Sequence, residues 1–139
     1  MNTTNIIEAP EADYLYVGLS QLPNSGNGLY TAIPVYKDEM IAVFKGEVLT
    51  DARAKLRAKK GNDKYFISML NGSIMDSMKT KCFAKYANDA EGLSKSGYKN
   101  NGKIALGDNG DVGIIAIRNI KKGEEIFCSY GKRYWKKHG

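Results

Sequence analysis

The sequence predicts a mainly β fold, in which small sheets carry one or two short helices. Short segments rich in β-branched and aromatic residues follow one another, and glycine, asparagine and proline separate them. Only one segment has the composition of a clear helix. Because strands follow strands instead of alternating with helices, the pattern does not fit a doubly wound α/β protein. The 139 residues suit a single domain, 1–139.

The elements of the first half are marked by turn residues and by one helix cap. Alanines and long unbranched side chains make "TDARAKLRAKKG" the clearest helix; Thr50 or Asp51 can cap it, and Gly61 ends it. The expected elements, in order, are a loose polar start (1–13), a strand (14–20), a glycine-containing loop or hairpin (22–33), a β-rich segment broken by Gly46 (39–49) and the helix (50–61).

Two Asn-Gly pairs organise the second half. Asn71-Gly72 is a turn signal, and Asn109-Gly110 between two apolar runs is typical of a β-hairpin. The expected elements are a strand (64–70), a short helix that runs into a loop (77–89), the hairpin (103–117) and a last strand (124–130).

The net charge of +6 is unevenly distributed. Residues 1–51 hold two Lys/Arg against seven Asp/Glu, residues 52–117 hold twelve against six, and residues 118–139 hold seven against two. Such an excess of lysine is either solvated surface or a footprint for an acidic partner such as nucleic acid. Because the lysines are scattered, the composition favours solvated surface.

Several protein classes do not fit the composition. Two cysteines, Cys82 and Cys128, with one terminal histidine, His138, provide neither a disulfide scaffold, a metal cage nor a Ser-His-Asp triad, so no metal is expected. The sequence contains no run of 18 apolar residues, so no membrane span is expected, and its first 14 residues do not resemble a signal peptide. An intracellular location is expected: cytoplasm in a prokaryote, nucleus in a eukaryotic or viral setting.

Four segments, taken in order, resemble the SET domain of protein lysine methyltransferases. The last segment is the most specific, and the spacing of all four is that of the family. The short chain resembles the minimal viral and microbial members, which lack zinc-binding flanks. The segments are "SGNGLYTA" (25–32), "FKGEVL" (44–49), "IMDSMKTKCFAKYANDAEG" (74–92) and "KKGEEIFCSYGKRYW" (121–135).

This resemblance implies small curved sheets of the β-clip type, an insert region over 50–80, and a C-terminal pseudoknot in which the last segment passes through a loop. Such threading is rare among folds. It would explain why the only tryptophan, Trp135, lies near a chain end, where order is usually low. The implied cofactor is S-adenosyl-L-methionine, and the implied reaction transfers its methyl group to a lysine ε-amine. Such a reaction needs no metal and no histidine base.

The resemblance also assigns residues to the cofactor. Each has a structural alternative: a plain turn for the glycine hairpin, an Asx turn for the Asn-Asp pair, a strand aromatic for the first tyrosine, and a hydrophobic lid for the terminal pair. At position 89 the family has histidine, so only the backbone role carries over to Asp89. The implied cofactor-binding residues are Asn27, Gly28, Leu29, Tyr65, Asn88, Asp89, Tyr134 and Trp135.

Three further residues are assigned to the reaction. Tyr130 matches the family's catalytic tyrosine, whose hydroxyl borders the methyl-transfer channel. Phe44 and Cys128 are expected to line the lysine channel; Phe44 replaces a frequent tyrosine, and a small Cys128 leaves room for a methylated amine. A core tyrosine and a small buried hydrophobic residue are the alternatives for Tyr130 and Cys128.

The implied partner is a lysine-containing protein, a histone or histone-like protein by family analogy. A lysine-rich substrate is expected to dock on the acidic N-terminal third, near Asp38, Glu39, Glu47 and Asp51. A second copy of the chain could complete the substrate groove, so a homodimer is left open. Two other functions stay open: a SET-like binding module without catalysis, and a nucleic-acid-binding domain that uses the basic aromatic stretch "KRYWKK".

Overall fold

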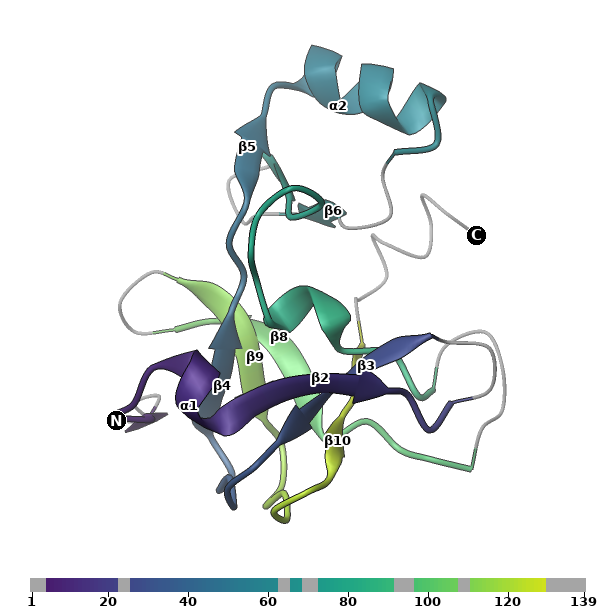
Figure 1. Cartoon of the computed structure of the whole chain (residues 1–139). Helices are drawn as coiled ribbons and strands as arrows, with labels where there is room; N and C mark the ends of the chain where they lie inside the picture. Colours follow the sequence, from purple (N-terminus) through teal and green to yellow (C-terminus); the bar gives the residue numbers. More distant parts are fainter. Residues whose placement is uncertain are drawn as a thin grey trace.

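The structure is a computed structural model of the chain, and it describes residues 5–22, 26–62, 66–68, 73–91, 97–107 and 111–129. The described residues form three small β-sheets and one nine-residue helix, α2, with two shorter helical turns. Figure 1 shows two levels: β2, β3, β4 and β8–β10 lie together, and β5, β6 and α2 lie above them. This arrangement confirms the mainly β fold class.

The largest sheet has five strands in the order β1-β4-β9-β8-β11. At its centre, β8 and β9 pair antiparallel, as the sequence predicts for 103–117. β9 lies between β4 and β8, and all five of its residues are buried. This position accounts for its continuous run of apolar residues. The strands are β1 (Asn5–Ile6), β4 (Glu39–Val43), β9 (Val112–Ala116), β8 (Gly102–Leu106) and β11 (Cys128–Ser129).

A second sheet has the order β10-β3-β2. The predicted strand at 14–20 becomes β2 (Leu15–Leu19), and the glycine-containing segment becomes β3 (Asn27–Thr31), which pairs with β2 over five residues. The third strand, β10 (Glu125–Ile126), lies on the other side of β3. The second sheet therefore joins the start of the chain to its last described segment.

The third sheet and α2 form the upper level of Figure 1. The break that the sequence predicts at Gly46 separates β4 from the third sheet. Only glycine fits at this position, because a Cβ there would lie 2.4 Å from the Asp76 carbonyl oxygen. The Thr50 hydroxyl caps α2 by accepting a hydrogen bond from the Arg53 amide at 3.3 Å. The elements are β5 (Glu47–Leu49), α2 (Asp51–Lys59), β6 (Phe66–Ser68) and β7 (Ile74–Asp76), in the sheet order β5-β7-β6.

Two segments differ from the sequence expectation. Residues 5–13, expected to be loose, contain β1 and most of the turn α1 (Glu11–Tyr14). Tyr14, expected to begin the first strand, ends this turn, and its buried hydroxyl donates to the Ile41 carbonyl at 2.7 Å. The helix expected over 77–89 is reduced to a three-residue 3₁₀ turn, η1 (Ala84–Tyr86). The Lys85 ammonium donates to three backbone carbonyls of residues 77, 78 and 80, and these bonds hold the segment as a loop.

The core lies between the first two sheets. Most of its fully buried side chains come from β3, β4, β9, β10 and β11. Val35 and Ile120, which form an isolated bridge outside the named strands, add two more. Burial of each large aliphatic side chain contributes about 1.5–3 kcal/mol to the free energy of unfolding. The largest are Leu29, Ile41, Ile114, Ile120 and Ile126.

Asn101, a fully buried polar residue, fastens the segment that runs from β10 to β11. Its side-chain amide donates to the Glu125 carbonyl at 2.9 Å, and its side-chain oxygen accepts from the Phe127 amide at 2.8 Å. Its own backbone N–H donates to the Phe127 carbonyl at 3.0 Å. The segment thus leaves one sheet and enters another without losing backbone hydrogen bonds. The pseudoknot itself stays a prediction, because residues beyond 129 lie outside the described part of the chain.

We expect Asn101→Ala to lower the free energy of unfolding by about 2–4 kcal/mol, because it leaves a buried carbonyl and a buried N–H without partners. Urea unfolding followed by circular dichroism measures this change. The control is Asn119→Ala, which removes an exposed amide whose oxygen accepts one bond from the Lys37 N–H at 2.9 Å. A loss for Asn101→Ala no greater than for the control would contradict this role.

Candidate functional site

Asn88 connects two of the segments that the SET resemblance assigns to the cofactor. Its side-chain amide donates to the Asn27 carbonyl on β3 at 2.9 Å, and its carbonyl accepts from the Cys128 amide at 2.9 Å. Asn88 also forms an isolated parallel bridge with Phe127. Residues 27, 88 and 128, which lie far apart in the sequence, therefore meet at one place.

Gly28 is needed at this place for a reason that the sequence does not reveal. A Cβ on Gly28 would lie 2.2 Å from Oε2 of Glu125 and 3.2 Å from the Ser20 Cα. The space above the glycine is therefore filled by a side chain of the protein. Leu29, its neighbour, is fully buried in the core, while the Asn27 side chain is exposed.

Glu125 is a buried carboxylate, with 2% of its surface exposed, and it organises the hairpin. Its Oε2 accepts from the Ser20 hydroxyl at 2.6 Å, and its Oε1 accepts from the Gln21 N–H at 2.7 Å. The Tyr30 hydroxyl also donates to Oε1, at 3.4 Å. These donors hold the end of β2 and the middle of β3 against β10. Desolvation, and to a smaller degree the Glu125 carboxylate, raises the pKa of the Tyr30 hydroxyl.

Asp89 forms an Asx turn, which is the structural alternative expected for this residue beside cofactor binding. Its Oδ1 accepts from the Glu91 amide at 2.9 Å and from the Asn100 side chain at 3.0 Å. Asn100 in turn accepts from the Ala90 amide at 2.8 Å. The loop that carries Asn88 is thereby tied to the loop before β8. The assignment of Asp89 to the cofactor stays a prediction.

Cys128 is fully buried in the main core. Burial, and to a smaller degree the negative charge of Asp89, raises the pKa of its thiol to about 12. A thiolate is therefore strongly disfavoured, as expected for a small apolar residue. Phe44, also expected at the lysine channel, is 3% exposed and belongs to the same core cluster. The two residues share the core, while their role in a channel stays a prediction.

The remaining predicted site residues cannot be compared with the structure. Tyr65, Tyr130, Tyr134 and Trp135 lie outside the described residues. The described part of the predicted site consists of the β3 hairpin, the loop at 88–91 and the strand segment at 125–129. Among described residues, no group of three or more His, Cys, Asp and Glu side chains could hold a metal ion.

The residues of the expected acidic docking surface are spread over two sheets, and docking there stays a prediction. Asp38 and Glu39 lie at the start of β4 in the five-stranded sheet, whereas Glu47 lies on β5 in the third sheet. Glu47 accepts hydrogen bonds from Arg53 at 2.8 Å and from Arg57 at 2.9 Å. The Arg57 hydrogen bond lowers the pKa of Glu47 despite some desolvation. Its charge is therefore balanced within the protein.

Sequence reasoning missed Asn101 and Glu125. Asn101 lies in "KNNGK", which has the composition of an exposed turn, and Glu125 lies in "KKGEEIF", where one of two glutamates would be expected to face solvent. Strand alternation gives no signal for the burial of Glu125, because it places Glu125 on the face opposite Ile126, and the structure buries both faces.

The hairpin, the Asn88 loop and the last strand meet within a mainly β domain, as the resemblance implies. The family model described as SET domain matches residues 26–131, which is more than half of the chain. The chain belongs to the SET-domain family. Among the described residues, no helix is long and apolar enough to cross a membrane.

Curated relatives are similar over most of this chain. The histone-lysine N-methyltransferase mes-2 of Caenorhabditis elegans is 29% identical over 118 residues, which cover 83% of this chain and 15% of the relative. The H3 lysine-36 specific histone-lysine N-methyltransferases of Saccharomyces cerevisiae and Aspergillus oryzae are 26% and 24% identical; the matches cover 84% and 85% of this chain. The chain spans only 16% and 12% of their lengths.

We expect Gly28→Ala to lower the free energy of unfolding by about 1–3 kcal/mol without any cofactor present, because the new methyl group overlaps Glu125. In a Glu125→Ala background the same change should cost less, since the overlapping carboxylate is gone. Urea unfolding of the four proteins of this cycle measures the coupling.

The matched control is Gly18→Ala on β2, directly opposite Gly28. A Cβ there would meet only the Tyr30 ring at 3.3–3.4 Å, a contact that a small ring shift relieves. Additive losses in the cycle, or equal losses for the two glycines, would show that Glu125 is not what requires Gly28.

The Cys128 thiol should make stability depend on alkaline pH. Its pKa is about 12 in the folded protein against 9.0 for the ordinary group, so only the unfolded state loses this proton between pH 9 and 12. The contribution is therefore complete below pH 9 and is lost as pH rises toward 12. Above pH 9, unfolding free energy should fall more steeply for wild type than for Cys128→Ala, by up to about 1.4 kcal/mol per pH unit.

Cys82→Ala, which keeps the Cys128 thiol, should follow wild type; parallel curves for wild type and Cys128→Ala would contradict the assignment.

Proposed function

We propose that this protein is an S-adenosyl-L-methionine-dependent protein-lysine N-methyltransferase. The observation that carries the proposal is the family match over residues 26–131, together with the meeting of Asn27, Asn88 and Cys128. The histone-lysine N-methyltransferase names of the relatives support the reaction class.

The described residues are compatible with the cofactor. The Asn88 side-chain oxygen forms no hydrogen bond within the described part of the chain, so it is available as an acceptor for an ammonium group. The Asp89 carboxylate lies next along the chain and favours a positively charged ligand. In this proposal Asn27, Gly28, Leu29, Asn88 and Asp89 hold the cofactor from the hairpin side.

The remaining assignments follow from the resemblance. Tyr65, Tyr134 and Trp135 complete the cofactor site, and Phe44 and Cys128 lie along the lysine channel. When bound, S-adenosyl-L-methionine would supply an electrophilic methyl group on a positively charged sulfur.

The protein's contribution is to orient the amine and to favour its neutral form. Free lysine has a pKa near 10.4, and a desolvated channel beside a positive charge lowers that pKa. Tyr130 is proposed to orient the amine with its hydroxyl. Asn88 acts at a distance from the amine: it fixes the hairpin against the last strand, so that the cofactor and the channel keep one relative position.

The proposed substrate is a lysine-containing protein, with histones as the first class to test. The printed names of the relatives motivate this choice. The proposal includes a homodimer in which a second copy completes the substrate groove. Light scattering of the purified chain measures whether it forms. The direct test of function incubates the purified chain with tritiated S-adenosyl-L-methionine and core histones, and detects transferred methyl groups.

Tyr130→Phe should lower kcat by about two orders of magnitude or more, because it removes one oriented hydroxyl needed in the transition state. Cofactor affinity, measured by calorimetry on the same protein, should change little. The fold should survive, with a stability change within roughly 1–2 kcal/mol.

The control is Tyr36→Phe, which removes the hydroxyl of an exposed tyrosine. Methyl transfer by Tyr130→Phe at the control's rate would refute the catalytic assignment. Cofactor binding by wild type without methyl transfer to any histone or cell-extract protein would favour the alternative, a SET-like binding module without catalysis.

A further inference from the structure

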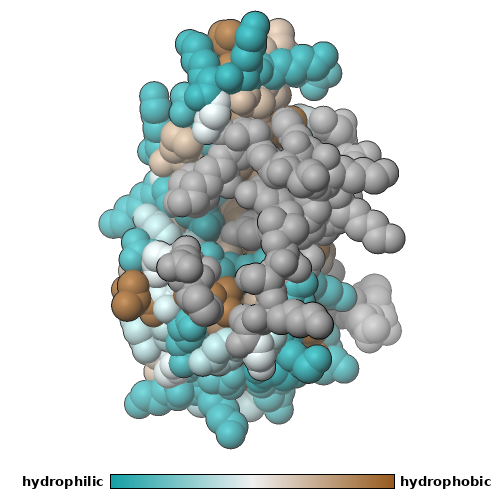
Figure 2. Space-filling model, turned by 90° about the vertical axis from the view of Figure 1, so that its right-hand side faces the viewer, coloured by the Kyte–Doolittle hydropathy of each residue, from teal (hydrophilic) through white to brown (hydrophobic). Residues whose placement is uncertain are grey.

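The segment from α2 to the turn after β7 carries most of the net positive charge of the chain. Residues 50–81 contain eight Lys/Arg and three Asp/Glu, a net charge of +5, against +6 for the whole protein. This segment forms α2 and its surroundings, at the end of the molecule away from β10 (Figure 1). Figure 2 shows that hydrophilic residues dominate this upper end.

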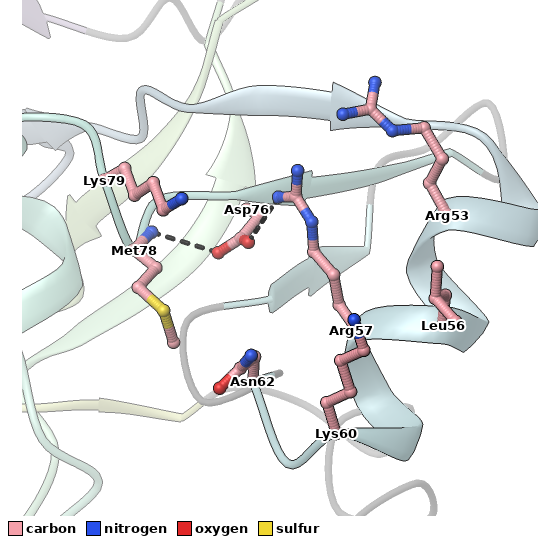
Figure 3. A pocket seen from close by; sticks show the side chains of 8 residues that line it. All are labelled: Arg53, Leu56, Arg57, Lys60, Asn62, Asp76, Met78 and Lys79. Carbon is pink, nitrogen blue, oxygen red and sulfur yellow. Dashed lines mark hydrogen bonds and ion pairs between the residues drawn. The ribbon is translucent and has the colours of Figure 1, made fainter.

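A pocket of about 300 Å³ lies beside α2. Its basic residues come from two directions: three from α2 and its end, and Lys79 from the turn after β7 (Figure 3). Leu56 and Met78 add apolar surface. The lining residues are Arg53, Leu56, Arg57, Lys60, Asn62, Asp76, Met78 and Lys79.

Internal carboxylates hold the two arginines in place. Arg57 forms ion pairs with Asp76 at 2.8 Å and Glu47 at 2.9 Å, and Arg53 pairs with Glu47 at 2.8 Å. Asp76, only 4% exposed, also accepts from the Met78 amide at 3.0 Å. These bonds fix the α2 side of the pocket to β7 and set the position of the turn that carries Lys79.

The two lysines of the pocket are not balanced in this way. Within the described part of the chain, neither the Lys60 nor the Lys79 ammonium forms a hydrogen bond or ion pair, and both residues are exposed. The positive surface continues beyond the pocket, because Lys55 and Lys59 are also exposed on α2. A prearranged pocket with two available cations thus opens onto a basic helix.

We propose that this pocket and the exposed face of α2 bind the phosphate backbone of nucleic acid, with Lys60 and Lys79 as the principal phosphate contacts. Phosphate contacts from lysine give sequence-independent binding. The nine residues of α2 span roughly 14 Å, which matches about four phosphates at 3.4 Å per nucleotide along one strand. Leu56 and Met78 can contact the sugar. None of the residues that line this pocket is a predicted cofactor residue, and phosphate binding there does not depend on methyl transfer.

An acidic protein segment fits the same charges less well. Arg53 and Arg57 are already paired at 2.8–2.9 Å, so they do not provide free bidentate donors for any anion. That leaves lysines, which act as point charges and suit a regular array of phosphates. An acidic peptide is therefore an outcome of the test that would overturn the proposal.

The experiment measures fluorescence anisotropy of a short fluorescein-labelled DNA duplex of mixed sequence, titrated with the full chain without cofactor. Lys60→Gln/Lys79→Gln is compared with wild type between about 50 and 200 mM salt. The matched control is Lys121→Gln/Lys122→Gln, which removes the same charge from the exposed turn before β10, at the other end of the molecule (Figure 1).

We expect the α2-pocket variant to bind about tenfold more weakly at low salt and to reduce the slope of log affinity against log salt by about two, one for each lysine. The control should keep the slope of wild type. Because all four lysines are exposed, the thermal unfolding midpoints of both variants should match that of wild type, and this is measured first.

Three outcomes would overturn the proposal. They are no binding of the duplex by wild type at about 50 mM salt, equal losses for the two variants, and competition by polyglutamate as strong as that by unlabelled DNA at equal charge. Equal losses would show that DNA affinity depends only on the net charge of the protein. Strong competition by polyglutamate would show that the pocket binds an acidic protein.

Discussion

The arrangement of the candidate site depends on the backbone hydrogen bonding of residues 125–129. This segment pairs with β3 through β10 and with β8 through β11, and between the two it is held by Asn101 and Asn88. A buried strand that changes sheets would ordinarily expose unpaired amides and carbonyls, each costing about 1–3 kcal/mol. The two asparagines supply side-chain and backbone partners at this crossing. Because of them, the hairpin, the 88–91 loop and the last strand converge.

Glu125 illustrates how the scaffold and the site share residues. The carboxylate is buried beside Gly28 and satisfied by Ser20 and Gln21, so it shapes the hairpin that we propose to bind the cofactor. A glycine in a ligand-binding hairpin is easily attributed to the ligand. In this protein the Glu125 side chain already explains why position 28 must be glycine. The cofactor contacts proposed for Asn27 and Leu29 are a separate matter.

The charges follow a division between the two levels of the fold. The lower level contains the core and those cofactor residues of the proposal that the structure describes, while residues 50–81 carry a net charge of +5. Glu47 and Asp76 position Arg53 and Arg57 in the insert, and lysines provide its accessible charge. The proposed phosphate contacts, Lys60 and Lys79, therefore lie on other elements than the described cofactor residues of β3 and the 88–91 loop.

Local patterns in the sequence determined the elements whose causes are local. The 103–117 hairpin follows from an Asn-Gly turn between apolar runs, and α2 follows from a Thr50 cap and helix-forming residues. Four spaced segments also determined the family. Tertiary structure decided what depends on distant partners: the loop around Lys85 in place of a helix, the separation of the acidic residues into two sheets, and the burial of Asn101 and Glu125. A polar residue in a turn-like stretch gives no sign of the distant amides and carbonyls that it will satisfy, because those partners are brought to it only by the sheet pairing.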